Sequence, residues 1–140
     1  MERDYIHNLN TSVSYNGETI LSTQEVVNAM NSANAALQEL SDTTKRFDIN
    51  IFEAIGLRNL SGMIGEYFAR SVMNISNGKL ESNLHQDGYP DLLLVDTPKK
   101  KAYFKTLYTE SNGKRYPIDK EHFSPFEYGG IEVKATCGST

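Results

Sequence analysis

The chain has 140 residues and a mass of 15.7 kDa, a size that suits one domain with a single hydrophobic core. Hydrophobic residues make up 39% and charged residues 23%, so the sequence is too apolar for a disordered protein. The longest aliphatic run, Leu92–Val95, is far too short for a transmembrane helix, and the acidic N-terminus excludes a secretory signal. The single cysteine, Cys137, excludes a disulfide framework and a zinc ribbon, and we expect a reducing, cytoplasmic location.

The charge is distributed unevenly along the chain. The net charge of −4 argues against a nucleic-acid partner, and residues 1–98 contain thirteen acidic and six basic side chains. Residues 99–120 reverse this balance with seven basic and two acidic side chains. The basic ones are Lys99, Lys100, Lys101, Lys105, Lys114, Arg115 and Lys120. This window could contact DNA phosphates locally, or it could be a solvated lysine-rich hairpin that protects a sheet edge from pairing.

The first half of the chain predicts two helices. A turn at Tyr15-Asn16-Gly17 precedes a helix from Ser22 to about Asp42, because Ser22 and Glu25 have capping-box spacing. Apolar side chains recur along this helix at helical intervals and form either core or a dimer contact: Val26, Val27, Met30, Ala33, Leu37 and Leu40.

A short helical turn over 51–55 leads to the second helix, which Asn59 or Ser61 caps and Asn77-Gly78 ends. Gly62 and Gly65 lie inside this helix, where each costs about 1 kcal/mol relative to alanine. We therefore expect another segment to pack closely against the helix at these glycines.

From residue 79 the pattern alternates, as in strands. It predicts strands over 79–84, 91–96, 102–108 and 131–135, with turns at 88–90 and 111–113 and a loop that continues to Pro125. Helices followed by strands indicate an α+β fold with a mixed or antiparallel meander.

Several kinds of catalytic site are excluded. The sequence has no glycine-rich phosphate loop, no paired histidines on a helix and no serine nucleophile elbow. The three histidines, His7, His85 and His122, are scattered, and we interpret them as surface or turn residues.

Two short motifs remain that could support phosphodiester hydrolysis. Asp91 follows Pro90 at the start of a buried strand, and Glu132-Val133-Lys134 lies on a strand 41 residues later. Mg²⁺ takes oxygen ligands from one or two carboxylates, and Asp91 and Glu132 could converge on it. The Val133 carbonyl could add a ligand, while Lys134 would lie on the same strand face as Glu132 and could orient the attacking water. Glu66, beside the apolar face of the second helix, could supply a third carboxylate.

These residues resemble the motif of the PD-(D/E)XK nuclease superfamily. Within it, the stretch from Gly129 to Thr136 resembles type II restriction endonucleases most. The resemblance covers about residues 58–138, so the chain would be one nuclease domain in which 1–57 form an N-terminal helical segment. It implies an α/β/α restriction-endonuclease-like core.

The resemblance also implies a function for each motif residue. Asp91 and Glu132 would bind Mg²⁺ or, in its place, Mn²⁺; Lys134 would assist the attacking water, and Glu66 would be an outer acidic ligand. The protein would act as a homodimer on double-stranded DNA. We expect no membrane partner and a location in the cytoplasm of a prokaryotic cell. The basic window, excluding Lys120, would contact DNA phosphates.

The chain departs from the family in one respect. The family core continues after the Glu-x-Lys strand with a helix and a further strand, whereas here only a few residues follow Lys134. We expect the chain to be the N-terminal part of a longer enzyme. Two alternatives to a restriction enzyme stay open: a repair or branched-DNA nuclease of the same fold, and a non-catalytic DNA-binding or assembly module. In the module, the two motifs would be an ordinary turn and an ordinary edge strand.

Overall fold

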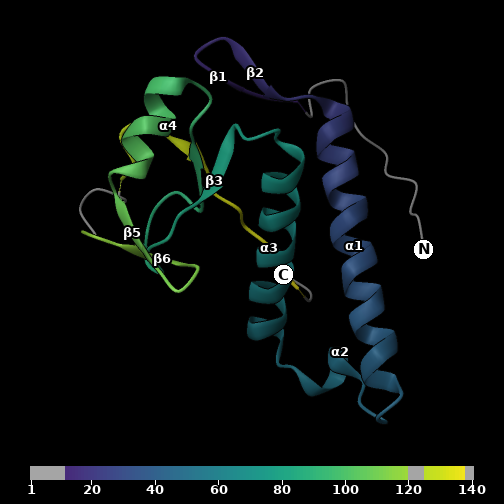
Figure 1. The fold of residues 1–140 in the computed structure, drawn as a ribbon. Coiled ribbons are helices and arrows are strands. Elements are labelled where there is room, and N and C mark those ends of the chain that lie inside the picture. The colour runs from purple at the N-terminus through teal and green to yellow at the C-terminus, as the bar shows by residue number, and fades with distance from the viewer. Residues whose placement is uncertain (1–11, 120–124, 138–140) are drawn as a thin grey trace. The chain divides into compact units, whose positions relative to one another are not determined.

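The computed structural model describes residues 12–119 and 125–137, and it has the mixed α+β composition that the sequence predicts (Figure 1). His7, Lys120 and His122 lie outside the described residues. The described residues form two compact units, which we describe separately: unit 1 comprises residues 12–75 and 133–137, and unit 2 comprises residues 76–119 and 125–132. None of the helices in the described part of the chain is both long and apolar enough to cross a membrane.

Unit 1 begins with a hairpin of β1 (Val13–Tyr15) and β2 (Glu18–Leu21). Its turn is the predicted one, since Asn16 and Gly17 have φ values of 50° and 82°, as a tight hairpin turn requires. The predicted helix follows as α1 (Thr23–Lys45), and the capping box is confirmed. The Ser22 hydroxyl accepts a hydrogen bond from the Glu25 N–H at 3.1 Å, while the Glu25 carboxylate accepts one from the Ser22 N–H at 3.0 Å.

Helix α1 packs along α3 (Leu57–Ile75) within unit 1, after the short helix α2 (Ile51–Ala54). The buried residues of α1 are Ala29, Ala33, Leu37 and Ser41. The apolar stripe of α1 therefore contributes to the core of unit 1. Helix α3 begins before the predicted caps Asn59 and Ser61, and the Ser61 hydroxyl instead donates to the Leu57 carbonyl at 2.9 Å.

The two glycines of α3 differ in their surroundings. A Cβ on Gly65 would lie 3.6 Å from the Cβ of Ala135, so the 133–137 segment does pass close to the helix there. A Cβ on Gly62 would meet no atom within 4 Å, so the prediction of close packing is wrong at that position. The segment is also held by the Cys137 N–H, which donates to the Ser61 hydroxyl at 3.0 Å.

Unit 2 is built on an antiparallel sheet in the order β3 (Leu80–Ser82), β4 (Leu92–Leu94) and β7 (Gly130–Ile131). Strand β4 is entirely buried, as its apolar sequence predicts. The predicted strand over 131–135 is wrong beyond Ile131, because β7 pairs with β4 at only two residues before the chain leaves the sheet.

The predicted strand over 102–108 is also wrong for most of its length. Residues 98–105 form helix α4 (Pro98–Lys105), in which the Thr97 hydroxyl accepts from the Lys100 N–H at 3.3 Å and Pro98 occupies the first turn. Phe104 in the helix and Leu107 in the turn that follows it are both buried, and the Leu107 N–H donates to the Phe104 carbonyl at 3.0 Å.

After α4, β5 (Tyr108–Ser111) and β6 (Lys114–Pro117) form a hairpin. Its turn is the predicted one, at Asn112-Gly113, where φ is 52° and 76°. The expected loop that continues to Pro125 is wrong over Lys114–Pro117, which form strand β6. This hairpin forms a separate two-stranded sheet. Of the predicted meander, only the pairing of β3 with the next strand, β4, is present. The third strand of that sheet is β7, which comes much later in the chain.

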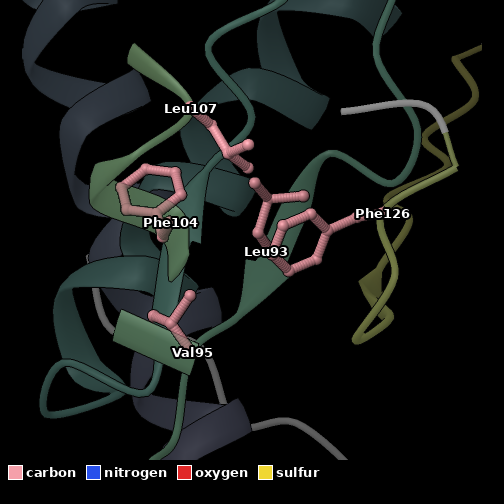
Figure 2. Close-up of a cluster of buried hydrophobic side chains, with 5 residues drawn as sticks. All are labelled: Leu93, Val95, Phe104, Leu107 and Phe126. Atoms are coloured by element: carbon pink, nitrogen blue, oxygen red, sulfur yellow. The ribbon is translucent and has the colours of Figure 1, made fainter. Parts of the chain in front are cut away.

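The core of unit 2 lies between the sheet, α4 and the 125–128 segment. Figure 2 shows its buried side chains: Leu93, Val95, Phe104, Leu107 and Phe126. Tyr103 and Tyr128 pack against this cluster with their rings edge to face, 5.3 Å between centroids. Burial raises the pKa of the Tyr103 phenol, and the nearby Glu127 carboxylate raises this pKa further.

Candidate functional site

Strands β4 and β7 bring two of the predicted metal ligands together in unit 2. Leu92 pairs with Ile131, and directly beyond this pair the Asp91 N–H donates to Oε2 of Glu132 at 3.2 Å. Both acidic residues are partly exposed. Two carboxylate residues 41 positions apart in the sequence are thus neighbours at the open end of a buried strand.

Gly130 makes this pairing possible. A Cβ on Gly130 would overlap the carbonyl oxygen of Leu92 and would lie 2.8 Å from Cγ of Pro90. Only glycine therefore lets β7 approach β4 closely enough for Glu132 to reach the backbone of Asp91.

The side chain of Asn83, which the sequence analysis did not predict to matter, holds the loop before Asp91. The Asn83 amide donates to the Pro90 carbonyl at 3.1 Å, and its oxygen accepts from the His85 N–H at 3.0 Å. The Asn83 N–H donates to the Asp91 carbonyl at 2.9 Å, which extends the pairing of β3 with β4 by one residue. An asparagine between a strand and the Gly88-Tyr89-Pro90 turn was the available signal for this role.

The other predicted catalytic residues belong to unit 1. Glu66 is exposed on α3, and Lys134 is exposed on the segment that follows Glu132. Because β7 ends at Ile131, Glu132 and Lys134 do not share a strand face as predicted. Val133 lines a cavity of about 220 Å³ in unit 1, together with side chains of α1 and α3. The metal contact of its carbonyl stays a prediction.

The donor set of unit 2 suits a hard divalent cation. Within residues 12–119 and 125–137, no three His, Cys, Asp or Glu side chains gather closely enough to form a metal site by themselves. Mg²⁺, however, commonly takes only one or two carboxylates and completes its shell with water and substrate phosphate. The hydrogen bond from Asp91 to Glu132 fixes one such carboxylate beside the other acidic residue. Two neighbouring carboxylate residues are of the kind that the sequence motif implies for Mg²⁺, and metal binding by the pair stays a prediction.

The residues of the predicted phosphate-binding window divide into three groups. Lys100 is engaged within unit 2: its ammonium pairs with Asp96 at 2.8 Å and lies 5.6 Å from the centre of the Tyr128 ring. Lys99 and Lys114 are exposed on α4 and β6. The remaining three, Lys101, Lys105 and Arg115, line one cavity of about 170 Å³.

Comparison with known proteins gives no relative from which a function could be transferred. No family model matches the chain, and none of the curated proteins or solved structures with which it was compared matches it either.

Proposed function

We propose that the protein is a Mg²⁺-dependent type II restriction endonuclease that hydrolyses phosphodiester bonds at specific sites in double-stranded DNA. The observation that carries this proposal is the contact between the Asp91 backbone and the Glu132 carboxylate at the paired ends of β4 and β7. It supports the sequence motif because the two residues expected to share a metal ion are distant in sequence and adjacent in unit 2. In this proposal the sheet belongs to a restriction-endonuclease-like core, and the protein acts as a homodimer.

Each motif residue has a distinct task in the proposed reaction. The Asp91 and Glu132 carboxylates hold Mg²⁺, which supplies charge neutralisation at the phosphate and a more acidic water. The Asp91 N–H keeps the Glu132 carboxylate oriented, so little reorganisation is needed when DNA binds. The family motif assigns Lys134 the orientation of the attacking water and Glu66 an outer acidic role, and these two roles stay predictions.

The first test is digestion of plasmid DNA by the protein expressed from its full reading frame, with Mg²⁺. We expect discrete fragments from the wild-type protein and none from Asp91→Ala. Asp87→Ala, which removes the same charge from an exposed position in the same loop, should cleave normally. A smear that disappears in Asp91→Ala would retain a nuclease but exclude restriction. Intact DNA with the wild-type protein would contradict the proposal and favour a binding module.

Lys134→Ala is expected to abolish cleavage. The Kd for DNA should stay within about threefold of the wild-type value, because Lys134 acts on the attacking water whereas several contacts to DNA phosphates dominate the affinity. Gel-shift titration without Mg²⁺ and single-turnover cleavage with Mg²⁺ measure the two quantities separately. Lys45→Ala, a charge-matched change at the exposed end of α1, is the control. Cleavage by Lys134→Ala at the wild-type rate would remove Lys134 from the mechanism.

A further inference from the structure

A cavity of about 170 Å³ in unit 2 lies away from the Asp91–Glu132 pair. Asp91 precedes β4, whereas Val95, which follows β4 at its other end, lines the cavity. At about 3.3 Å per residue, four residues of extended chain separate the two positions by about 13 Å. The residues lining the cavity are Gly78, Glu81, Val95, Lys101, Phe104, Lys105, Tyr108 and Arg115.

The charged side chains of the cavity come from three elements. Lys101 and Lys105 are four residues apart on α4 and therefore lie on one side of the helix. Arg115 comes from β6 and Glu81 from β3, which leaves the lining with an excess of two positive charges. The ammonium of Lys101 lies 3.5 Å from the position that a Cβ on Gly78 would occupy, so it lies beside that turn.

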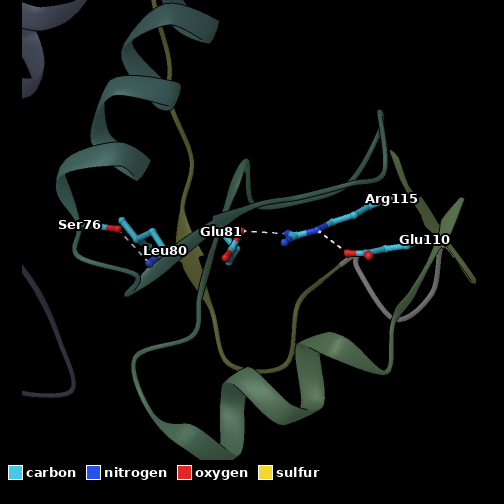
Figure 3. Close-up of polar contacts among 5 residues, drawn as sticks. All are labelled: Ser76, Leu80, Glu81, Glu110 and Arg115. Atoms are coloured by element: carbon cyan, nitrogen blue, oxygen red, sulfur yellow. Dashed lines mark hydrogen bonds and ion pairs between the residues drawn. The ribbon is translucent and has the colours of Figure 1, made fainter. Parts of the chain in front are cut away.

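Arg115 is held in place by contacts that leave part of its guanidinium free for another acceptor. Nη1 of Arg115 lies 3.4 Å from Glu81 and Nε lies 3.5 Å from Glu110. Figure 3 shows the guanidinium between these two carboxylates. The guanidinium also stacks over Tyr108, 4.9 Å from the ring centre. These two ion pairs use two of the five N–H donors of an arginine, and both are long and exposed. A planar fork positioned in this way suits a phosphate oxygen.

We propose that this cavity binds a phosphate group of the DNA backbone. Three cationic side chains line this space of about 170 Å³, which is large enough for several water molecules at roughly 30 Å³ each. The buried Phe104 and Val95 side chains share the lining and lower the screening of these charges. The cavity's affinity for phosphate is argued from its own residues alone. That this phosphate belongs to DNA rests on the proposed nuclease function. Bound there, the phosphate would position the duplex without reading its sequence.

The affinity for phosphate is tested with inorganic phosphate as the probe. In NMR spectra of the ¹⁵N-labelled protein, we expect phosphate to shift the amide signals of Gly78 and Arg115, whereas chloride at equal ionic strength should not. The shifts should disappear in Lys101→Gln/Lys105→Gln. They should persist in Lys99→Gln/Lys114→Gln, which removes the same charge from exposed positions on α4 and β6 that do not line the cavity. Absence of shifts in the wild-type protein, or equal loss in both variants, would overturn the site.

The source of the phosphate is tested by DNA binding without Mg²⁺ as a function of salt. The logarithm of the binding constant falls with that of the salt concentration by about 0.9 for each phosphate contact. In Lys101→Gln/Lys105→Gln, the magnitude of this slope should be smaller by about one. This variant should also bind DNA about tenfold more weakly than the wild-type protein, whatever the DNA sequence. An unchanged slope alongside intact phosphate shifts would overturn the assignment to DNA in favour of free phosphate. Asp91→Ala should keep the full salt dependence of DNA binding. The cavity proposal therefore fails on the salt slope, whereas the nuclease proposal fails on DNA cleavage.

Discussion

Glu132→Gln is expected to lower Mg²⁺-dependent cleavage by about a thousandfold, because metal stabilisation of phosphate charge contributes several kcal/mol and each 1.36 kcal/mol is a tenfold rate change. The glutamine oxygen can still accept the Asp91 N–H, so the local structure is retained. Single-turnover cleavage measures the rate. Thermal unfolding with and without Mg²⁺ measures binding: Mg²⁺ should raise the Tm of the wild-type protein but not of this variant.

Two further variants separate metal binding from folding. Glu132→Ala removes both the charge and the hydrogen bond with Asp91, and it should also cost about 0.5–1.5 kcal/mol of stability. Glu53→Gln, an exposed change on α2, should leave both the cleavage rate and the Mg²⁺ effect intact. If Glu132→Gln retained a wild-type increase in Tm with Mg²⁺, Glu132 would not be a metal ligand and the site would have to lie elsewhere.

Gly130→Ala should lower the free energy of unfolding by about 3 kcal/mol, at the upper end of the usual cost of overpacking. The added methyl group would overlap the Leu92 carbonyl, which is rigid backbone and cannot rotate away as a side chain could. The pairing of β7 with β4 must then open, and the contact between Asp91 and Glu132 opens with it. Urea unfolding gives the stability, and the Mg²⁺ effect on Tm should also be lost.

The matched control is Gly62→Ala in α3, where a Cβ would meet no atom within 4 Å. Alanine is favoured over glycine in a helix by about 1 kcal/mol, so this variant should be more stable than the wild-type protein and equally active. The two substitutions add the same methyl group, but we expect them to change the free energy of unfolding in opposite directions. Equal effects would show that space at Gly130 does not limit the approach of the strands.

Features set by neighbouring residues were the ones predictable from the sequence. The capping box at Ser22 and the Asn-Gly turns at Asn16 and Asn112 depend on side chains within a few positions, and all three are confirmed. In α4, the alternating aromatic and polar residues favoured a strand. The helix-start signal Thr97-Pro98 was present and proved decisive. An eight-residue segment is too short for periodicity to distinguish the two structures.

Features that depend on distant parts of the chain were less predictable. The length of β7 is set by its short pairing with β4, which its own alternating sequence does not report. The cavity beside Arg115 requires α4, β3 and the β5–β6 hairpin together, so the sequence indicated only that the basic residues are concentrated there. The pairing of Asp91 with Glu132 was inferred from motif spacing, and the neighbouring positions of the two residues within unit 2 agree with that inference.

The division of the chain into units has a consequence for the order in which the protein folds during synthesis. Unit 2 is one continuous stretch, so all of its residues have been synthesised once Glu132 has been added. Unit 1 is interrupted by unit 2, and its α3 is complete long before the 133–137 segment that contacts Ser61 and Gly65 is made. Since the chain emerges from its N-terminus at about 5–20 residues per second, α1 and α3 can pair early, but unit 1 gains its last contacts only after all of unit 2 has been made.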